Sequence, residues 1–338
     1  MIKILISMLT ALILCVGCVS STPDEEKYTT DVFAMDTVMN ITAYGPYAED
    51  AVHTAINEII RIENLFSTNI TTSEIAMLNK HKTQSVSPET FALLETSIQL
   101  YEETNSAFNI AIFPIVKAWG FTTDSYQIPS DETLLELLPH TKVSDILLDS
   151  ELFRVTLAPK MELGLGGIVK GYTSERIMEL FKEHGITSGI VNLGGNVQVL
   201  GTKPDGSLWN IGIQDPLSPS SYIGFVSVQD KAVITSGPYE RNFKENGTIY
   251  HHLIAPTTGR PAENTLASLT IISDNGTCAD AFTKLFVLGL DDTIAYWQTH
   301  QDEFDMILAT TENTIYITKN LQGHFTLQSE DYNLEVLH

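Results

Sequence analysis

Two Gly-Gly pairs lie within one stretch of the chain, Glu162–Asp215, where the lack of side chains lets the backbone approach a ligand closely. Gly166-Gly167 precedes a segment with helical periodicity, and Gly194-Gly195 separates two segments with strand character. Backbone N–H groups at such turns can bind an anion. Lys170 follows the first pair and is the one cation well placed for a phosphate, although a solvated first-turn lysine is the alternative. We therefore look for anion chemistry in this stretch.

A histidine pair, His251-His252, lies in a predicted strand just before Pro256. Adjacent strand residues face opposite sides, so only one of the two imidazoles can point into a given site. A neutral imidazole can accept the proton of an incoming hydroxyl group. A structural role is the alternative, because paired histidines are more often structural. Spacing alone leaves this choice open.

The composition describes a globular chain: 338 residues, 43% of them hydrophobic and 18% charged. The formal net charge is −23. Such a charge repels nucleic acids and anionic lipid surfaces, so we expect no nucleic-acid partner. A phosphate ligand must then be held locally, by backbone donors or by a metal ion.

Residues 1–18 have the pattern of a bacterial lipoprotein signal peptide, with one lysine, an apolar run over 4–14 and a Val-Gly-Cys ending. The run is too short for an ordinary membrane span. We expect lipidated Cys18 and a tether over 19–30 to anchor the protein in the bacterial cell envelope, facing the periplasm or the exterior. A plain signal peptide or a short anchor is the alternative. Only Cys278 then stays free, which excludes an intramolecular disulfide.

Residues 31–338 alternate predicted strands and helices without an internal repeat, which favours a single mixed α/β domain with two mixed sheets and flanking helices. Ser87-Pro88 and Ser130 carry helix-start signals. The predicted helices span 49–66, 88–101, a short segment after 130, 168–184, 278–288 and 291–299. The predicted strands span 33–44, 146–157, 188–193, 197–200, 209–214, 222–228, 232–235, 249–254, 266–272, 305–309, 314–318 and 325–328.

Motifs along the chain, in their order, resemble those of the ApbE family. They are LGGIVKGY (165–172), VNLGGN (191–196), ITSGPYER (234–241), YHHLIAPTTGRPAEN (250–264) and ADAFTKLFVLG (279–289). Weaker signals in the same order are MDT (35–37), SEIAMLN (73–79) and AFNIAIFPIVKAWGF (107–121). The resemblance implies one T-fold-like domain.

The resemblance also implies an FAD:protein FMN transferase that uses Mg²⁺. Such an enzyme cleaves FAD and attaches FMN through a phosphoester to a threonine of an exported or membrane-bound redox protein. Some lipoproteins that resemble the family instead hydrolyse FAD to FMN and AMP.

The site residues that the resemblance implies fall into three groups. His252 is the expected catalytic base. The Mg²⁺ would take the carbonyl oxygen of Gly167 and the side chains of Asp280 and Thr283, which at helical spacing i and i+3 can point the same way; ordinary helix residues are the alternative. The flavin contacts are Met35, Thr37, Ala107, Phe108, Asn109, Lys170 and Leu253, although Phe108 could simply pack in the core.

The chain departs from the family pattern where carboxylates or glycine are common. Asn109, Gly164 and Ala255 stand where the family commonly has Asp, Asp36 stands where it has Gly, and the spacing before FVLG is one residue short. Two function classes therefore stay open. One is the Mg²⁺-dependent transferase, and the other is an FAD-binding lipoprotein that stores FAD or hydrolyses it with little or no transfer.

Overall fold

The computed structural model describes residues 26–123 and 125–338. Its largest element is a nine-stranded sheet with the strand order β1-β2-β6-β7-β10-β13-β14-β15-β17. Neighbouring strands run antiparallel except β15 and β17, which run parallel. The strands are β1 (Lys27–Ala34), β2 (Thr37–Tyr44), β6 (Ser188–Leu193), β7 (Asn196–Leu200), β10 (Ala232–Ser236), β13 (Leu266–Ser273), β14 (Asp305–Thr310), β15 (Thr314–Thr318) and β17 (Asn333–Leu337).

Three smaller sheets complete the strands of the described residues. They have the orders β16-β9-β8, β3-β5-β4 and β11-β12. Their strands are β3 (Thr83–Ser85), β4 (Leu147–Asp149), β5 (Arg154–Thr156), β8 (Trp209–Gln214), β9 (Tyr222–Val228), β11 (Asn242–Glu245), β12 (Thr248–His251) and β16 (Phe325–Leu327). The predicted mixed α/β class is confirmed. The sheets number four rather than the two expected, and only the largest is mixed.

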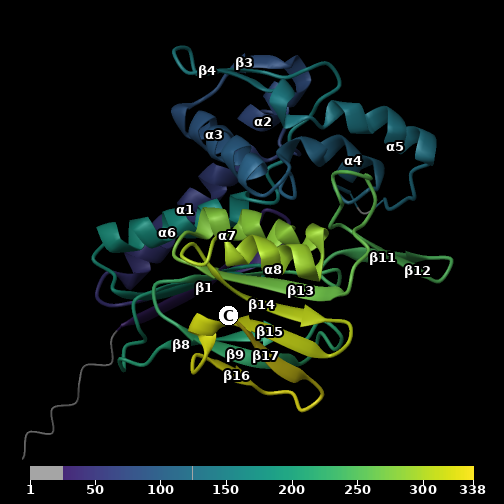
Figure 1. Ribbon diagram of the computed structural model, residues 1–338. Coiled ribbons are helices and arrows are strands. Elements are labelled where there is room, and N and C mark those ends of the chain that lie inside the picture. The colour runs from purple at the N-terminus through teal and green to yellow at the C-terminus, as the bar shows by residue number, and fades with distance from the viewer. Residues whose placement is uncertain (1–25, 124) are drawn as a thin grey trace, which may run out of the picture.

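The helices cover one face of the large sheet and build a separate upper layer (Figure 1). The α-helices are α1 (Ala48–Phe66), α2 (Glu74–His81), α3 (Pro88–Glu103), α4 (Phe113–Ala118), α5 (Asp131–Leu137), α6 (Val169–Glu183), α7 (Gly276–Phe282) and α8 (Leu290–Gln298). Short 3₁₀ helices are η1 (Ile110–Ile112), η2 (Leu138–His140), η3 (Val143–Asp145), η4 (Thr283–Leu288) and η5 (Lys319–Leu321). None of the helices in the described part is long and apolar enough to cross a membrane.

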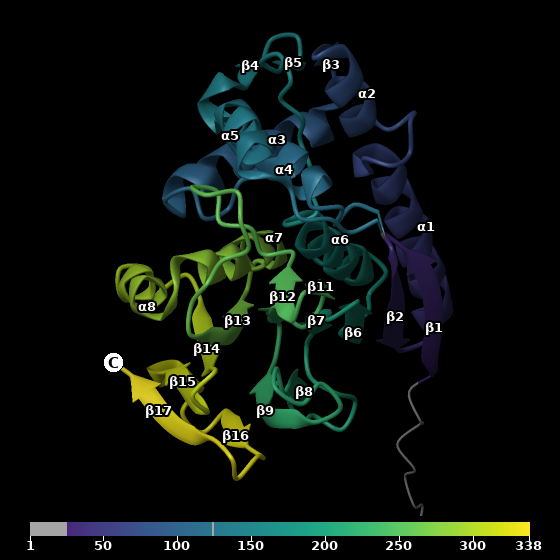
Figure 2. The same cartoon turned by 90° about the vertical axis from the view of Figure 1, so that its right-hand side faces the viewer.

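Figure 2 shows the resulting layers, with α2 to α5 and the small sheet of β3, β4 and β5 above, α6 and α7 in the middle, and the large sheet and the sheet of β8, β9 and β16 below. One apolar core joins the large sheet to the sheet of β8, β9 and β16, through residues such as Val199, Ile211 and Val226. Another lies between the large sheet and the helices α1 and α6. Every residue of the central strand β13 is buried because elements cover both faces of the sheet there.

The helix-start signals act as predicted. Ser87 Oγ accepts the backbone N–H of Thr90 and Pro88 opens α3, while Ser130 Oγ accepts the N–H of Thr133 at the start of α5. A side-chain oxygen at this position satisfies a backbone donor that has no partner inside the helix. The sequence therefore places the start of both helices correctly.

Two predicted strands are instead hairpins. The segment 33–44 divides into β1 and β2 at Met35-Asp36, where both residues have positive φ, 50° and 59°. Two residues with positive φ form the turn whose twist matches antiparallel strands. The segment 146–157 likewise divides into β4 and β5, which pair antiparallel.

Two other predicted elements end earlier. The strand over 249–254 ends at His251, after which the backbone N–H of His252 donates to the Arg241 carbonyl. The helix over 278–288 is α-helical from Gly276 to Phe282 and continues as η4. A 3₁₀ helix rises about 2.0 Å per residue against about 1.5 Å in an α-helix, so η4 is the more extended part of this segment.

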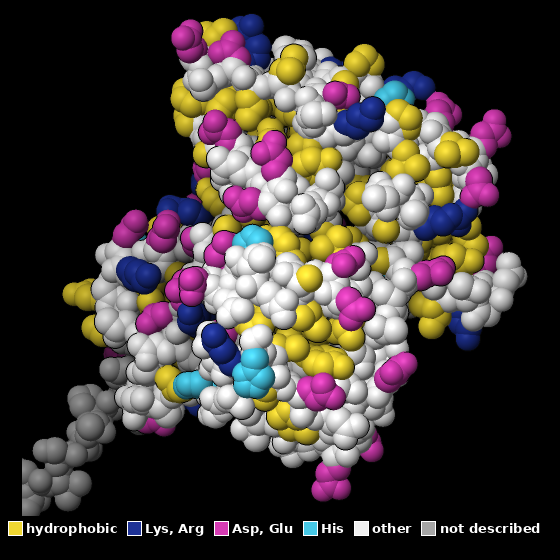
Figure 3. All heavy atoms as spheres, in the orientation of Figure 1, with side chains coloured by type: hydrophobic (Ala, Val, Ile, Leu, Met, Phe, Trp, Pro, Cys, Tyr) yellow, Lys and Arg dark blue, Asp and Glu magenta, His cyan; other side chains and the backbone are white. Residues whose placement is uncertain are grey.

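Residues 1–18, with the predicted lipidation of Cys18, and most of the predicted tether lie outside the described residues. Residues 27–30 of that tether belong to β1, so the folded part begins before residue 31. Figure 3 shows Asp and Glu side chains spread over one face with Lys and Arg side chains scattered among them, as the net charge of −23 leads one to expect.

Candidate functional site

A cavity of about 810 Å³ is lined by segments that lie far apart in the sequence. Its walls come from the β1–β2 turn, the loop after α1, the segments around 107–116 and 164–170, the end of β10, the residues after β12, and α7 with η4. This volume is typical of sites that enclose a cofactor-sized ligand. All of the predicted site residues from the described part line it except Thr283: Met35, Thr37, Ala107, Phe108, Asn109, Gly167, Lys170, His252, Leu253 and Asp280.

The β1–β2 turn forms one edge of the cavity. Met35 N donates to Glu63 Oε1 of α1 at 2.7 Å, which holds the turn against the helix. Asp36 takes the left-handed conformation where the family has Gly, and Asp is one of the few other residues that tolerate it. A Cβ atom on Gly194, which itself has φ +67°, would lie 2.4 Å from Thr37 Oγ1. The second Gly-Gly pair is therefore a strand connection that packs against the site.

Two departures from the family pattern have local structural reasons. A Cβ atom on Gly164 would lie 2.5 Å from Cδ2 of Phe113, so the phenyl ring occupies the space that a carboxylate would need. The side-chain amide of Asn109 makes two hydrogen bonds to backbone groups. Its Oδ1 accepts from Ala111 N at 2.8 Å, and its Nδ2 donates to the Thr141 carbonyl at 3.1 Å. Phe108 packs in the main core and also borders the cavity.

The Gly166-Gly167 turn leads into α6, and Lys170 of the first turn of α6 lines the cavity. The helix packs very closely on α7. A Cβ atom on Gly171 would lie 2.1 Å from the carbonyl oxygen of Gly276, and the Gly171 N–H donates to Asp280 Oδ2 at 3.0 Å. Glycine at 171 therefore lets the two helices place their site residues opposite each other.

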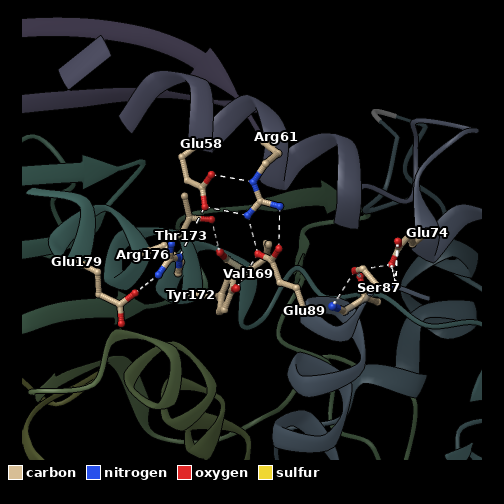
Figure 4. A network of polar contacts seen from close by, with 11 residues as sticks. Glu58, Arg61, Glu74, Ser87, Glu89, Val169, Tyr172, Thr173, Arg176 and Glu179 are labelled. Carbon is tan, nitrogen blue, oxygen red and sulfur yellow. Dashed lines mark hydrogen bonds and ion pairs between the residues drawn. The ribbon is translucent and has the colours of Figure 1, made fainter. Parts of the chain in front are cut away.

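A polar network connects α6 to α1 and α3 (Figure 4). Arg61 donates from both ends of its guanidinium group, to Glu58 at 2.7 and 2.8 Å and to Glu89 at 2.7 Å twice. Tyr172 Oη of α6 donates to the same Glu89 at 2.7 Å. The hydrogen bonds from Arg61 lower the pKa of both carboxyl groups. Bidentate ion pairs of this kind fix the relative orientation of the two side chains, so the network holds α6 and its Gly-Gly turn in place.

His252 and His251 face different cavities. His251 is buried and lines a smaller one of about 360 Å³, with Nε2 close to the Ala262 carbonyl at 3.1 Å. His252 lines the large cavity, and its Nδ1 lies 3.1 Å from the carbonyl oxygen of Arg241. A carbonyl only accepts, so Nδ1 carries the proton and Nε2 has a free electron pair. Enclosure by the cavity walls lowers the pKa of His252 to about 3, which keeps the imidazole neutral.

Lys284 of η4 reaches back to Asp280 one turn earlier. Its Nζ lies 2.7 Å from Thr283 Oγ1, 3.1 Å from the Asp280 carbonyl oxygen and 3.4 Å from Asp280 Oδ1. The buried Thr283 hydroxyl also donates to the Asp280 carbonyl at 2.6 Å and accepts from Ser236 Oγ at 2.9 Å. With one donated and two accepted hydrogen bonds, the hydroxyl has no electron pair left.

The predicted Mg²⁺ ligand set of Gly167, Asp280 and Thr283 does not fit a metal ion in this arrangement. Thr283 does not line the cavity, and the single carboxylate, Asp280, already faces an ammonium group. Mg²⁺ is usually held by one or two carboxylates with water and substrate phosphates, and here the oxygens of Asp280 and Thr283 already have other partners. Throughout residues 26–123 and 125–338, no group of three or more His, Cys, Asp or Glu could hold a metal ion.

Glu240 also borders the cavity, close to Lys170 and Lys284. The residue is exposed to the water of the cavity. Desolvation raises the pKa of Glu240 to about 7, and the positive charges of Lys170 and Lys284 oppose the rise. This carboxyl group therefore changes charge near neutral pH.

Glu240, Arg241 and Lys284 are among the charged residues of the cavity wall that were missed as site residues. Lys170 was expected to be the one cation well placed for a phosphate, but Lys284 and Arg241 also line the cavity. Helical spacing could have found Lys284, because it follows Asp280 by four residues and shares its face. Glu240 and Arg241 belong to a recognised motif but carried no spacing signal of their own.

The comparisons with known proteins agree with this picture. Residues 35–308 match the family model described as the ApbE family. A Treponema pallidum protein named FAD:protein FMN transferase is 32% identical over 313 residues, covering 86% of each chain. A Klebsiella pneumoniae protein of the same name is 30% identical over 294 residues, covering 85% of this chain and 90% of the relative.

Solved structures match over most of the chain. A crystal structure of the ApbE protein from Thermotoga maritima superposes with a TM-score of 0.83 at 28% identity, covering 88% of this chain and 99% of that one. The flavin transferase ApbE from Vibrio cholerae, at 24% identity, shares the fold with a TM-score of 0.79 over 89% of this chain and 99% of that one. From the family match, the relatives and the fold, the chain belongs to the ApbE family.

Proposed function

We propose that this protein is an FAD:protein FMN transferase, which moves the FMN half of FAD onto a hydroxyl group of an acceptor protein. The observation that carries the proposal is the cavity of about 810 Å³, which gathers the residues that the family motifs assign to flavin. Relatives with this name match over most of their length. The acceptor is a protein with an accessible threonine.

The transfer breaks one P–O bond and forms another. The threonine oxygen attacks the phosphorus of the FMN half, the P–O bond to the AMP half breaks, and AMP leaves. The hydroxyl proton goes to His252 Nε2, which is free because Nδ1–H donates to the Arg241 carbonyl. Lys170 and Lys284, which both line the cavity, balance negative charge on the phosphates.

Mg²⁺, which the family resemblance implies, has no role in these steps. The Lys284 ammonium group contacts the predicted metal ligands, and the Thr283 hydroxyl has no free electron pair for a metal ion. The proposal therefore assigns chemistry only to the residues of this chain.

Incubation of the purified full-length protein with FAD and a threonine-bearing acceptor tests the proposal. We expect yellow, covalently labelled acceptor and an equal amount of free AMP, with loss of both in His252→Ala. Free FMN and AMP without labelled acceptor would indicate hydrolysis, and FAD that stays bound and intact would indicate storage. Either of these outcomes would replace the transferase assignment.

We also propose, from residues 1–18 alone, that Cys18 carries a lipid anchor and that the protein acts in the cell envelope on an exported or membrane-bound acceptor. Fractionation of cells that produce the wild type or Cys18→Ser tests this. The wild type should stay with the membranes and be labelled by palmitate. A membrane-bound, unlabelled wild type would contradict lipidation.

A further inference from the structure

Lys284 stands where the family motifs would place a divalent cation. Its ammonium group is surrounded by the Thr283 hydroxyl at 2.7 Å, the Asp280 carbonyl at 3.1 Å and the Asp280 carboxylate at 3.4 Å. We propose that Lys284 is the resident cation of the cavity, and that it takes the place of Mg²⁺ in binding the diphosphate of the nucleotide. The choice of a nucleotide diphosphate as the ligand rests on the proposed function. The statement that Lys284 occupies the position of the cation does not depend on it.

The backbone at Gly167 is shaped around this lysine. A Cβ atom on Gly167 would lie 3.0 Å from Lys284 Cε and 3.8 Å from its Nζ. The lysine stem therefore fills the space beside the residue whose carbonyl oxygen was expected to bind the metal. Glycine at 167 gives the stem this room.

The helix also favours the ammonium group. Asp280 precedes Lys284 by four residues, which is the favourable order for an ion pair on one face of a helix. The carbonyl oxygen of Asp280 lies near the end of α7, where the helix dipole attracts positive charge. The ammonium group thus has a stable position before any ligand binds.

A divalent ion would have to compete with this group. Asp280 is the only carboxylate beside the ammonium group among its hydrogen-bond partners in the described structure, and its Oδ2 already accepts from Gly171 N at 3.0 Å. The Thr283 hydroxyl has no free electron pair. Two cations next to one carboxylate repel each other, so an ammonium group that stays in place excludes Mg²⁺.

Lys284 remains available to a ligand. Its side chain is 20% exposed, and it lines the cavity together with Lys170. An ammonium group has three donors and binds phosphate as a point charge. The ligand class that this pair of cations fits is a dinucleotide or nucleotide diphosphate.

Mg²⁺ alone is the first probe. We expect millimolar MgCl₂, compared with NaCl of equal ionic strength, to leave the melting temperature of the apoprotein unchanged. Lys284→Met removes the competing charge and should show a saturable rise with Mg²⁺. Lys170→Met, a matched loss of one cavity cation that leaves Asp280 paired, should show none.

FAD binding, followed by flavin fluorescence, is the second probe. The wild type should bind FAD equally well in EDTA and in Mg²⁺. Lys284→Met should bind about tenfold more weakly in EDTA and recover in Mg²⁺, whereas Lys170→Met should weaken without recovery. If Lys284→Met does not fold, Lys284→Arg, which keeps the charge, should bind FAD without a response to Mg²⁺.

A saturable stabilisation of the wild type by Mg²⁺, or FAD binding that requires Mg²⁺, would overturn the inference. A wild type that binds no FAD under any condition would instead overturn the proposed function. The experiment with Mg²⁺ alone would still decide whether Lys284 is the resident cation.

Discussion

Gly171 and Asp280 connect two helices through one hydrogen bond, from the Gly171 N–H to Asp280 Oδ2 at 3.0 Å. The other oxygen of the same carboxylate faces Lys284. One side chain therefore both fastens α6 to α7 and balances the charge of the cavity.

Asp280→Ala should destabilise the protein by about 2 kcal/mol, because it removes a buried acceptor and leaves the Lys284 ammonium group without its counter-charge. Urea unfolding at neutral pH measures this. Asp280→Asn keeps an oxygen for Gly171 and should lose about half as much. Equal stability of wild type and Asp280→Ala would contradict the dual role.

Gly171→Ala should destabilise the protein by about 3 kcal/mol, because the new methyl group would lie 2.1 Å from the Gly276 carbonyl oxygen and force α6 from α7. Gly166→Ala is the control in the same segment, since its Cβ atom would have no neighbour within 4 Å. Thermal unfolding compares the two. A similar melting temperature for both variants would show that the close helix contact does not limit stability.

His252→Ala should lower the rate of transfer by about 10²- to 10⁴-fold, as expected for loss of a general base. The pKa of His252, lowered from 6.5 to about 3, keeps the base unprotonated across neutral and mildly acidic pH. At saturating FAD the wild-type rate should therefore not fall as the pH is lowered from 8 to 5, within the limits set by protein stability. A rate that falls by half near pH 6.5 would show that the working base has an ordinary histidine pKa.

The lowered pKa of His252 also makes the folded protein less stable as the pH falls. The unfolded state binds a proton near pH 6.5, and the folded state does not until about pH 3. The contribution of His252 to the free energy of unfolding is therefore fully present above pH 6.5, and it decreases as the pH falls from 6.5 to about 3. His252→Ala should flatten this part of the stability profile.

Glu240 should make FAD binding weaker as the pH rises. Its pKa, raised to about 7, means that the carboxyl group gains a negative charge between pH 6 and 8, close to where a diphosphate would bind. We expect about fivefold weaker binding at pH 8 than at pH 6, because cavity water screens the repulsion to about 1 kcal/mol. Glu240→Gln should bind equally at both pH values, and a pH dependence that survives in this variant would assign the effect to another group.

Much of the site could be predicted from sequence because its motifs are local. The motifs that carry His252, Asp280 and Gly167 predicted these residues as members of one site, and they do border one cavity. The predicted position of Gly194-Gly195 between two strands is also what the structure has. The chemical role of such residues can be recognised from the residue type and its spacing within a short motif.

The rest depended on contacts that spacing does not encode. Met35-Asp36 lacks the usual turn residues, so the end of β1 and all of β2 were predicted as one strand over 33–44. β11 has a single large apolar residue, Phe243, and is held by its pairing with β12 and by the stacking of Phe243 on Tyr250. By contrast, Lys284 was not assigned to the site, although its spacing of four residues from Asp280 would have placed it on the same helix face.

The edges of the nine-stranded sheet are the first and last strands that the structure describes, β1 and β17, and its middle joins β7 to β10 and β10 to β13. The cavity walls accordingly run from Met35 to Val287 in the sequence. Contacts over such separations form slowly, since long loops must close before they are made. A nascent chain that has not yet produced α7 would lack one wall of the cavity, so we expect flavin to bind only after α7 has been made and not to serve as a template for early folding.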